Sequence, residues 1–436
     1  MPYTTEMSNI PTKGLKMKSV IGRFIGVFEV ILSLGVLIAF FYPTPTRDAW
    51  VGLIYGYPMI WAVRFTVLRQ STNLSAQVIL SGIAFIVLCL INIVVAPYPT
   101  RGMILLYRPM WGIALMVMGT GWVRRSQSLR GVIWGTGILA GLTAIAVLTA
   151  TTWEGKASRF ADLTRYLPDT RSFAVWAGGF NPNEIAGAVV WLAPILFATA
   201  IRGRLNGRWR AISMSIFVAL FTGLFLGQSL SGLIGLSVGM IIALTPRRLW
   251  PWMTGLVLVG ILIANALIFI APTSSAEVLA DLSGRPKVTS LEHRGVMWER
   301  GVQMFRDHPL TGVGIALYRQ LRAEYPTPGF ENALVPHPHN EALHFATDLG
   351  VSGVLVWLML YASAGLSLYQ AWKDDRLRPW VIAVAAGLIA HAVYGLTDAI
   401  PVWDRLAFVG WWVLGLSAAL EIKATLPARP DTPSSD

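Results

Sequence analysis

Long apolar stretches, separated by short polar ones, occupy most of this 436-residue chain. About 20 apolar residues in an α-helix span the hydrocarbon layer of a bilayer, and a lone segment in lipid must satisfy its own backbone hydrogen bonds, which favours helix. The pattern predicts an all-α polytopic membrane protein with about 12 transmembrane helices. The apolar stretches are residues 19–42, 50–69, 76–97, 102–123, 131–150, 182–201, 209–227, 230–246, 250–271, 350–372, 379–400 and 404–422.

Two longer polar segments, 151–181 and 272–349, interrupt this alternation. We therefore expect an N-terminal bundle of about nine helices at 1–271, a large loop at 272–349, and a C-terminal bundle of about three helices with a short tail at 350–436. The first part of the large loop, 272–288, is expected to be irregular, and the rest to contain short helices.

Charge sets the expected orientation. Only 13% of the residues are charged and 54% are hydrophobic, whereas soluble domains carry about 25% charged residues. Lysines and arginines gather in alternate short loops, such as 124–130, 202–210 and 373–378, which the positive-inside rule assigns to the cytoplasm. Both termini are then cytoplasmic, and both long segments lie outside. The net charge of +12 is spread over many loops, so nucleic-acid binding is not predicted.

A helix is predicted from Thr289 to about Asp307, because Thr289 and Glu292 have the spacing of a capping box. At 100° per residue its apolar face holds Leu291, Trp298, Val302 and Phe305, and its opposite side holds Glu292, Glu299, Arg300, Gln303 and Arg306. Arg294 projects from the middle of the apolar face. Since a desolvated, unpaired arginine is costly, Arg294 should either bind an anion or serve structure, in a salt bridge or by snorkelling.

The six histidines gather between His293 and His391. Pro336 and Pro338 disfavour helix before them, so a helix should begin near His339 or Asn340, with His339 pointing inward at its N-terminus. There the helix dipole disfavours imidazolium, which favours a neutral base, and the free backbone N–H groups attract phosphate. The alternative is a histidine that only caps the helix. The spacing of His337, His339 and His344 is not that of a helical zinc pair, so no metal is predicted.

Other polar residues interrupt the apolar stretches. His391, Tyr394 and Asp398 follow Gly387 on one small and polar stripe within 379–400. Such a stripe is either functional or a contact between helices. Arg108 lies inside the stretch 102–123, and Arg101 and Arg47 lie at outer helix ends, where each could meet a lipid phosphate or merely snorkel.

Two segments, HRGVMWERGVQMFRDHPLTGVG (293–314) and HNEALHFATDLGVSG (339–353), resemble the core of the O-antigen ligase and polymerase family of bacterial membrane proteins. The matching features are an arginine four residues before a tryptophan, an HPL-x-GVG turn, and an HN pair followed nine residues later by G-x-x-G. NPNEIAG (181–187) also resembles a family feature. The chain departs at 229–232, where SLSG replaces an SRG-like turn, so a second phosphate-binding arginine would have to be Arg108, Arg101 or Arg47.

The resemblance implies an O-antigen ligase, a glycosyltransferase that moves a glycan from undecaprenyl pyrophosphate to a sugar hydroxyl of lipid A–core on the periplasmic face of the inner membrane. His339 would be the catalytic base and Arg294 would stabilise the leaving pyrophosphate. Neither a metal nor a cofactor is expected, because the outer segments hold no D-x-D pair, and attack opposite the leaving group would invert the anomeric centre. Substrate-binding candidates are Arg108, Arg101, Arg47, His337, Asn340 and Asp398.

Three alternatives stay open. An O-antigen polymerase would use the same donor with another lipid-linked glycan as acceptor. A protein O-oligosaccharyltransferase of the same family would use a pilin-like serine or threonine. A transporter of lipid-linked glycans would have its site at the membrane midplane, on broken helices, whereas the polar signal here gathers in outer segments. Neither the glycan nor the core sugar is identified by the sequence.

Overall fold

A computed structural model describes residues 12–41, 56–66, 76–96, 102–103, 105–153, 161–173, 178–203, 205–282, 289–326, 335–400 and 402–426. The chain divides into two compact units, Met1–Asn73 and Leu74–Asp436. Helices make up nearly all of the regular structure in these residues, where only an isolated bridge, between Thr151 and Phe180, has β pairing. The prediction of an all-helical chain is therefore confirmed for the described part. Arg47 and Arg101 lie outside it.

The first unit contains α1 (Thr12–Phe41) and α3 (Gly56–Thr66). Two buried side chains, Glu29 and Arg64, form an ion pair between these helices. Each charge offsets the desolvation of the other, which is how ionisable groups are accommodated in an apolar bundle.

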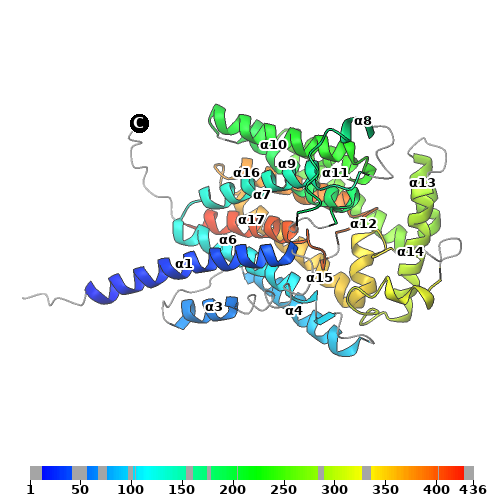
Figure 1. The fold of residues 1–436 in the computed structure, drawn as a ribbon, viewed down its shortest axis with the longest axis horizontal. Helices are drawn as coiled ribbons and strands as arrows, with labels where there is room; N and C mark the ends of the chain where they lie inside the picture. Colours follow the sequence, from blue (N-terminus) through cyan, green and yellow to red (C-terminus); the bar gives the residue numbers. More distant parts are fainter. Residues whose placement is uncertain are drawn as a thin grey trace, which may run out of the picture. The chain divides into compact units, whose positions relative to one another are not determined.

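The second unit contains the remaining helices (Figure 1). They are α4 (Ala76–Val95), α6 (Tyr107–Ser126), α7 (Arg130–Thr149), α8 (Ala161–Thr164), α9 (Pro182–Arg202), α10 (Gly207–Leu226), α11 (Leu230–Leu244), α12 (Trp250–Ile270), α13 (Pro272–Leu282), α14 (Thr289–Asp307), the 3₁₀ turn η4 (Gln320–Ala323), α15 (Glu341–Trp372), α16 (Arg378–Tyr394) and α17 (Phe408–Thr425). Every predicted apolar stretch coincides with one of the helices of the two units. Five of them, α7, α9, α10, α12 and α15, are long and apolar enough to cross a membrane. The chain is thus a membrane protein, and the larger number of spans stays a prediction.

Helix α9 is the most buried of these spans, since 83% of its apolar window lies inside the protein. It packs against α16, where small residues allow close approach. A Cβ on Gly387 would lie 2.4 Å from the carbonyl oxygen of Trp191. One turn further on, the His391 ring stacks on Trp191 at 3.6 Å between centroids. Gly387 and His391 of the predicted stripe therefore contact a neighbouring helix. Helix α16 ends at Tyr394, whereas the predicted stretch ran to residue 400, so Asp398 lies beyond the helix.

Two details of the large loop differ from expectation. Residues 272–282, expected to be irregular, form α13, because tertiary packing decides where local propensity is weak. A Cβ on Gly295 of α14 would lie 2.8 Å from the Cβ of Ala276, so the two helices approach closely. Helix α14 itself is confirmed, but Arg300 is not on its exposed side: it is 1% exposed and lies 5.6 Å over the ring of Tyr318.

Helix α15 begins at Glu341, as the two prolines predicted, and continues past a break at Gly350. Gly350 has φ 70° and ψ −159°, a region essentially restricted to glycine. A Cβ there would lie 2.5 Å from the carbonyl carbon of Leu310. The amide of Val351 donates to the carbonyl of Pro309 over 2.7 Å. The break thus lets the turn at 308–314 pack directly on the helix backbone.

We predict that Gly350→Ala lowers the stability of the folded protein by about 1–3 kcal/mol through backbone strain alone. The matched control is Gly365→Ala on the same helix, where an added Cβ meets no atom within 4 Å. Thermal unfolding of both variants in one detergent measures the difference. Equal melting temperatures for the two variants would contradict the strain at Gly350.

Candidate active site

A buried carboxylate, Asp398, joins the two residues that the sequence singled out for chemistry. Its Oδ1 lies 2.9 Å from Nδ1 of His339, and its Oδ2 lies 3.4 Å from an Nη of Arg294. Asp398 and Arg294 are 2% and 8% exposed. The three side chains come from α14, from the segment before α15 and from the segment after α16, so the fold assembles the cluster from distant parts of the chain.

Hydrogen bonds on both sides fix the position of His339. Its backbone has φ 53°, a left-handed conformation. Its own N–H donates to Nδ1 of His337 over 3.2 Å, and Nε1 of Trp298 donates to its carbonyl oxygen over 3.2 Å. Trp298, expected on the apolar face of α14, therefore also carries the polar contact that ties α14 to the histidine segment.

Asn340 is the N-cap of α15. Its Oδ1 accepts from the amide of Leu343 over 2.7 Å, and its Nδ2 donates to Oδ1 of Asn265 and to the carbonyl of Leu396 over 2.9 and 3.1 Å. Capping satisfies one of the free amides at the start of the helix. The side chain also links α12, α15 and the segment that carries Asp398, so it holds the cluster in register.

Electrostatics fix the charge of the carboxylate. Burial alone would raise the pKa of Asp398, but His339, through its charge when protonated and through its hydrogen bond, and the charge of Arg294 outweigh burial and hold this pKa below its usual range. Asp398 is therefore ionised at neutral pH and can only accept hydrogen bonds. Burial, reinforced by the neighbouring His339, lowers the pKa of His337 well below its usual value. His337 is thus neutral, in agreement with its role as acceptor from the His339 amide.

An ionised Asp398 places the ring proton of His339 on Nδ1, because a carboxylate oxygen at 2.9 Å needs a donor. In the neutral ring Nε2 is then the acceptor, and none of the described residues forms a hydrogen bond with it. A histidine oriented by a carboxylate in this way is the base arrangement found in catalytic triads. The sequence placed Asp398 on a polar stripe of a predicted span and did not indicate its pairing with His339.

Arg294 does contact a carboxylate, as the structural interpretation expected. That contact, at 3.4 Å, involves one nitrogen of the guanidinium, which carries five N–H donors in a planar fork. No other hydrogen bond joins this guanidinium to the residues that the structure describes, so its remaining donors are available for an oxyanion beside His339. Burial strengthens such contacts, since charges in a dry site are poorly screened.

A metal is the other ligand that this cluster could hold. One ligand atom each from His337, His339 and Asp398 lies within 4.8 Å of the others. The third member is Asp398 rather than His344, whose Nε2 lies 3.8 Å from Asp348 instead. Nδ1 of His337 and Nδ1 of His339 already have hydrogen-bond partners, and the Arg294 guanidinium would repel a second cation at the same carboxylate. The residues fit an anion site better than a metal site.

Arg108 lies elsewhere. Its Nη1 donates to the carbonyl of Trp403, and its Nε donates to the hydroxyl of Tyr107 over 3.1 Å. It thus contacts the segment 402–407, which follows Asp398 along the chain, and none of its described contacts reaches His339 or Arg294.

The sequence missed a second polar group, centred on Asp348 of α15. Its Oδ2 accepts from the amide of Ala316 and from Nε1 of Trp403 over 2.9 and 2.7 Å. Asn92 of α4 donates to the carbonyls of Thr311 and Asp348 over 2.7 and 3.0 Å. An asparagine within an apolar stretch is the signal that could have indicated this network.

Residues 215–358 match the family model described as O-antigen ligase. The match covers about a third of the chain and supports an assignment to the O-antigen ligase family. The matched segment runs from α10 into α15 and includes Arg294, Trp298 and His339, whereas Asp398 and Arg108 lie outside it. No curated protein matches the chain significantly. Together with the apolar helices long enough to cross a membrane, the match supports a membrane-embedded enzyme of the glycosyl-transferring, ligase or polymerase type.

We predict that glycosyl transfer by the purified protein is unchanged in excess EDTA, because Arg294 takes the place of a metal at the Asp398 carboxylate. Rates before and after chelation measure this directly. Activity that falls with EDTA and returns with Mg²⁺, Mn²⁺ or Zn²⁺ would instead assign His337, His339 and Asp398 to a metal.

Proposed function

We propose that this protein is an O-antigen ligase, which transfers a glycan from undecaprenyl pyrophosphate to a sugar hydroxyl of lipid A–core. The observation that carries the proposal is the buried cluster in which one carboxylate, Asp398, contacts both His339 and Arg294. The cluster combines an oriented base with a guanidinium, which is the pair that a metal-independent transfer from a pyrophosphate donor requires.

In the proposed reaction Nε2 of His339 takes the proton of the acceptor hydroxyl as its oxygen attacks the anomeric carbon. The new glycosidic bond forms while the bond from that carbon to the pyrophosphate oxygen breaks, with inversion. Asp398 stabilises the imidazolium that results. Arg294 donates hydrogen bonds to the departing pyrophosphate, whose charge develops chiefly in the transition state. No further energy source is needed, because the donor already carries its leaving group.

We place the site on the periplasmic face of the inner membrane. Tyr394, at the C-terminal end of α16, donates its hydroxyl proton to the carbonyl of Asn183 at the start of α9, so Asp398 lies beside the N-terminal end of α9. The basic loops 202–210 and 373–378 follow or precede the opposite ends of these two helices. The positive-inside rule then assigns those loops to the cytoplasm and the cluster to the other side.

The deciding experiment supplies purified protein with the lipid-linked donor and, separately, with lipid A–core, a second lipid-linked glycan or a pilin-like peptide. Transfer to lipid A–core supports the ligase. Transfer only to the second glycan indicates a polymerase, and transfer only to the peptide indicates a protein O-oligosaccharyltransferase. His339→Ala should reduce the rate by about 10²- to 10⁴-fold, whereas the exposed His308→Ala should be nearly normal. Near-normal turnover by His339→Ala would exclude His339 as the base.

A separate prediction concerns Arg294→Lys. Lysine keeps the charge but cannot form two parallel hydrogen bonds to a pyrophosphate, so we expect a large loss of kcat with the fold retained. Arg294→Ala should lose roughly 10²-fold or more. Arg306→Lys, an exposed position on the same helix, is the matched control. Unchanged donor affinity and turnover for Arg294→Lys would make this arginine structural only.

A further inference from the structure

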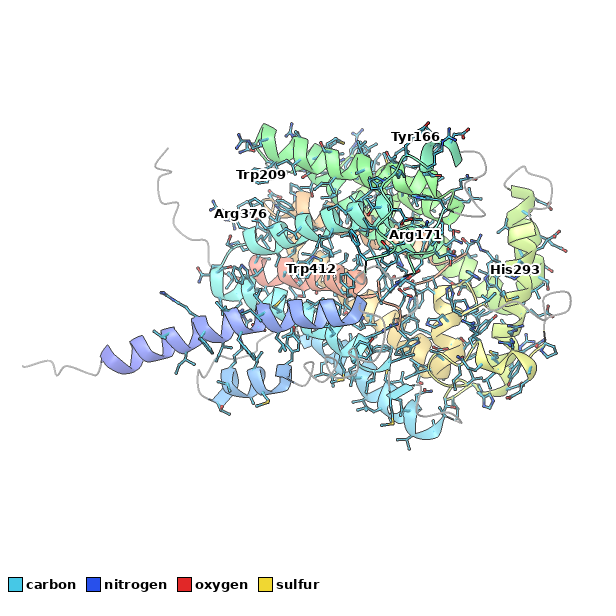
Figure 2. The ribbon with its side chains drawn as sticks, in the orientation of Figure 1. Tyr166, Arg171, Trp209, His293, Arg376 and Trp412 are labelled. Carbon is cyan, nitrogen blue, oxygen red and sulfur yellow. The ribbon has the colours of Figure 1, made fainter. Side chains whose placement is uncertain are left out.

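A second site candidate lies at the other end of the larger unit. A cavity of about 710 Å³ is lined by residues of α7, α9, α10, α16 and α17. On α9 it is lined by Ile195, Leu196 and Thr199, near the end of the helix, whereas Asn183 at the start of α9 contacts Tyr394 beside the Asp398 segment. Trp209 of this cavity and Arg376 lie at one end of the unit in Figure 2, and His293 lies at the other.

The walls of this cavity are mainly apolar and its rim is open. Its volume falls in the range of roughly 300–1,000 Å³ that is usual for small-molecule sites. Trp134 and Ile138 on the rim are 52% and 60% exposed, so the cavity opens toward the surroundings of the helices. Trp134 and Trp209 meet edge to face, with centroids 4.4 Å apart, and Trp380 also lines the wall. Tryptophans gather in this way at the level of lipid head groups.

One arginine lines this cavity, and two more are sequence neighbours of a lining tryptophan. Arg130 lines the cavity, and Arg208 and Arg210 flank Trp209. All three are exposed, and none forms an ion pair with an acidic side chain in the part of the chain that the structure describes. The nearby carboxylates are already engaged: Asp374 and Asp375 pair with Arg376 and Arg378, and Glu421 accepts from Ser367 over 2.6 Å.

We propose that this cavity binds one anionic phospholipid, with its acyl chains against the apolar walls and its phosphate at Arg130 and Arg208. An apolar cavity that opens between membrane helices fills with lipid, and a basic rim selects a negative head group. The polyprenyl donor fits less well, because its pyrophosphate belongs to the cluster at the opposite end. The choice of a phospholipid over the polyprenyl donor rests on the proposed function, whereas the cavity itself contains none of the residues of the Asp398 cluster.

Gly137 offers a clean way to fill the cavity. It lines the wall on α7, and a Cβ there meets no atom within 4 Å. Gly141, one turn further along the same helix, has equally open space but does not line the cavity. Gly137→Phe should therefore occupy the lipid site, and Gly141→Phe is its matched control.

The test measures lipid binding to delipidated full-length protein by native mass spectrometry, with phosphatidylglycerol and phosphatidylethanolamine of identical acyl chains. We expect phosphatidylglycerol to bind at least tenfold more tightly. Gly137→Phe should weaken its binding at least tenfold, and Gly141→Phe should leave it unchanged. The double variant Arg130→Gln, Arg208→Gln should lose the preference between the two lipids, whereas the exposed Arg322→Gln should keep it.

Three outcomes would overturn the proposal. Equal affinity of the wild type for both phospholipids would remove the role of the arginines. Equal binding by Gly137→Phe and Gly141→Phe would place the lipid outside the cavity. Tighter binding of undecaprenyl phosphate than of phosphatidylglycerol by the wild type, lost in Gly137→Phe but kept in Gly141→Phe, would assign the cavity to the polyprenyl chain instead. Melting temperatures of all variants, measured without lipid, show whether each one is folded.

Discussion

The ion contacts of Asp398 are the interaction on which the arrangement of the site depends. A carboxylate that is 2% exposed is stable in ionised form only if cations and donors surround it. Arg294 on α14 and His339 before α15 supply them, so α14, the start of α15 and the segment after α16 must meet at this carboxylate. The residues proposed for the reaction are thus also those that balance the buried charge of Asp398, and neutralising one of them would leave the others unpaired.

Close packing between the backbone of the turn at 308–314 and the backbone of α15 stabilises the region around His339. Gly312, at φ 67°, and Gly350 have no room for a side chain, and the amides of Val313 and Gly314 donate to the carbonyls of Thr347 and Asp348 over 2.8 and 3.2 Å. Asn92 of α4 donates hydrogen bonds to the turn, at the carbonyl of Thr311, and to α15, at the carbonyl of Asp348. The turn after α14 is therefore fixed to the helix that follows His339, which limits how far Arg294 and His339 can separate.

Much of the fold could be predicted because a bilayer imposes a simple rule on length and hydropathy. The apolar stretches coincide with helices, and the burial of Arg294 and Trp298 followed from the periodicity of one helix. Periodicity failed for Arg300, which is buried against Tyr318 by a partner distant in sequence, and for α13, whose helix depends on packing against Gly295. The pairing of Asp398 with His339 could not be predicted, because 58 residues of chain separate them and α16 ends before Asp398.

The position of Asp398 along the chain has a consequence for any exchange of the matched segment with another protein. The segment matched to the ligase family ends at residue 358. The carboxylate that contacts His339, Asp398, comes 40 residues later, after the end of α16 at Tyr394. A chimaera that exchanges only the matched segment would transfer the proposed base, His339, together with Arg294. The carboxylate that pairs with them would then have to come from the recipient protein. The short segment after α16 that carries Asp398 would therefore have to be exchanged together with the matched segment.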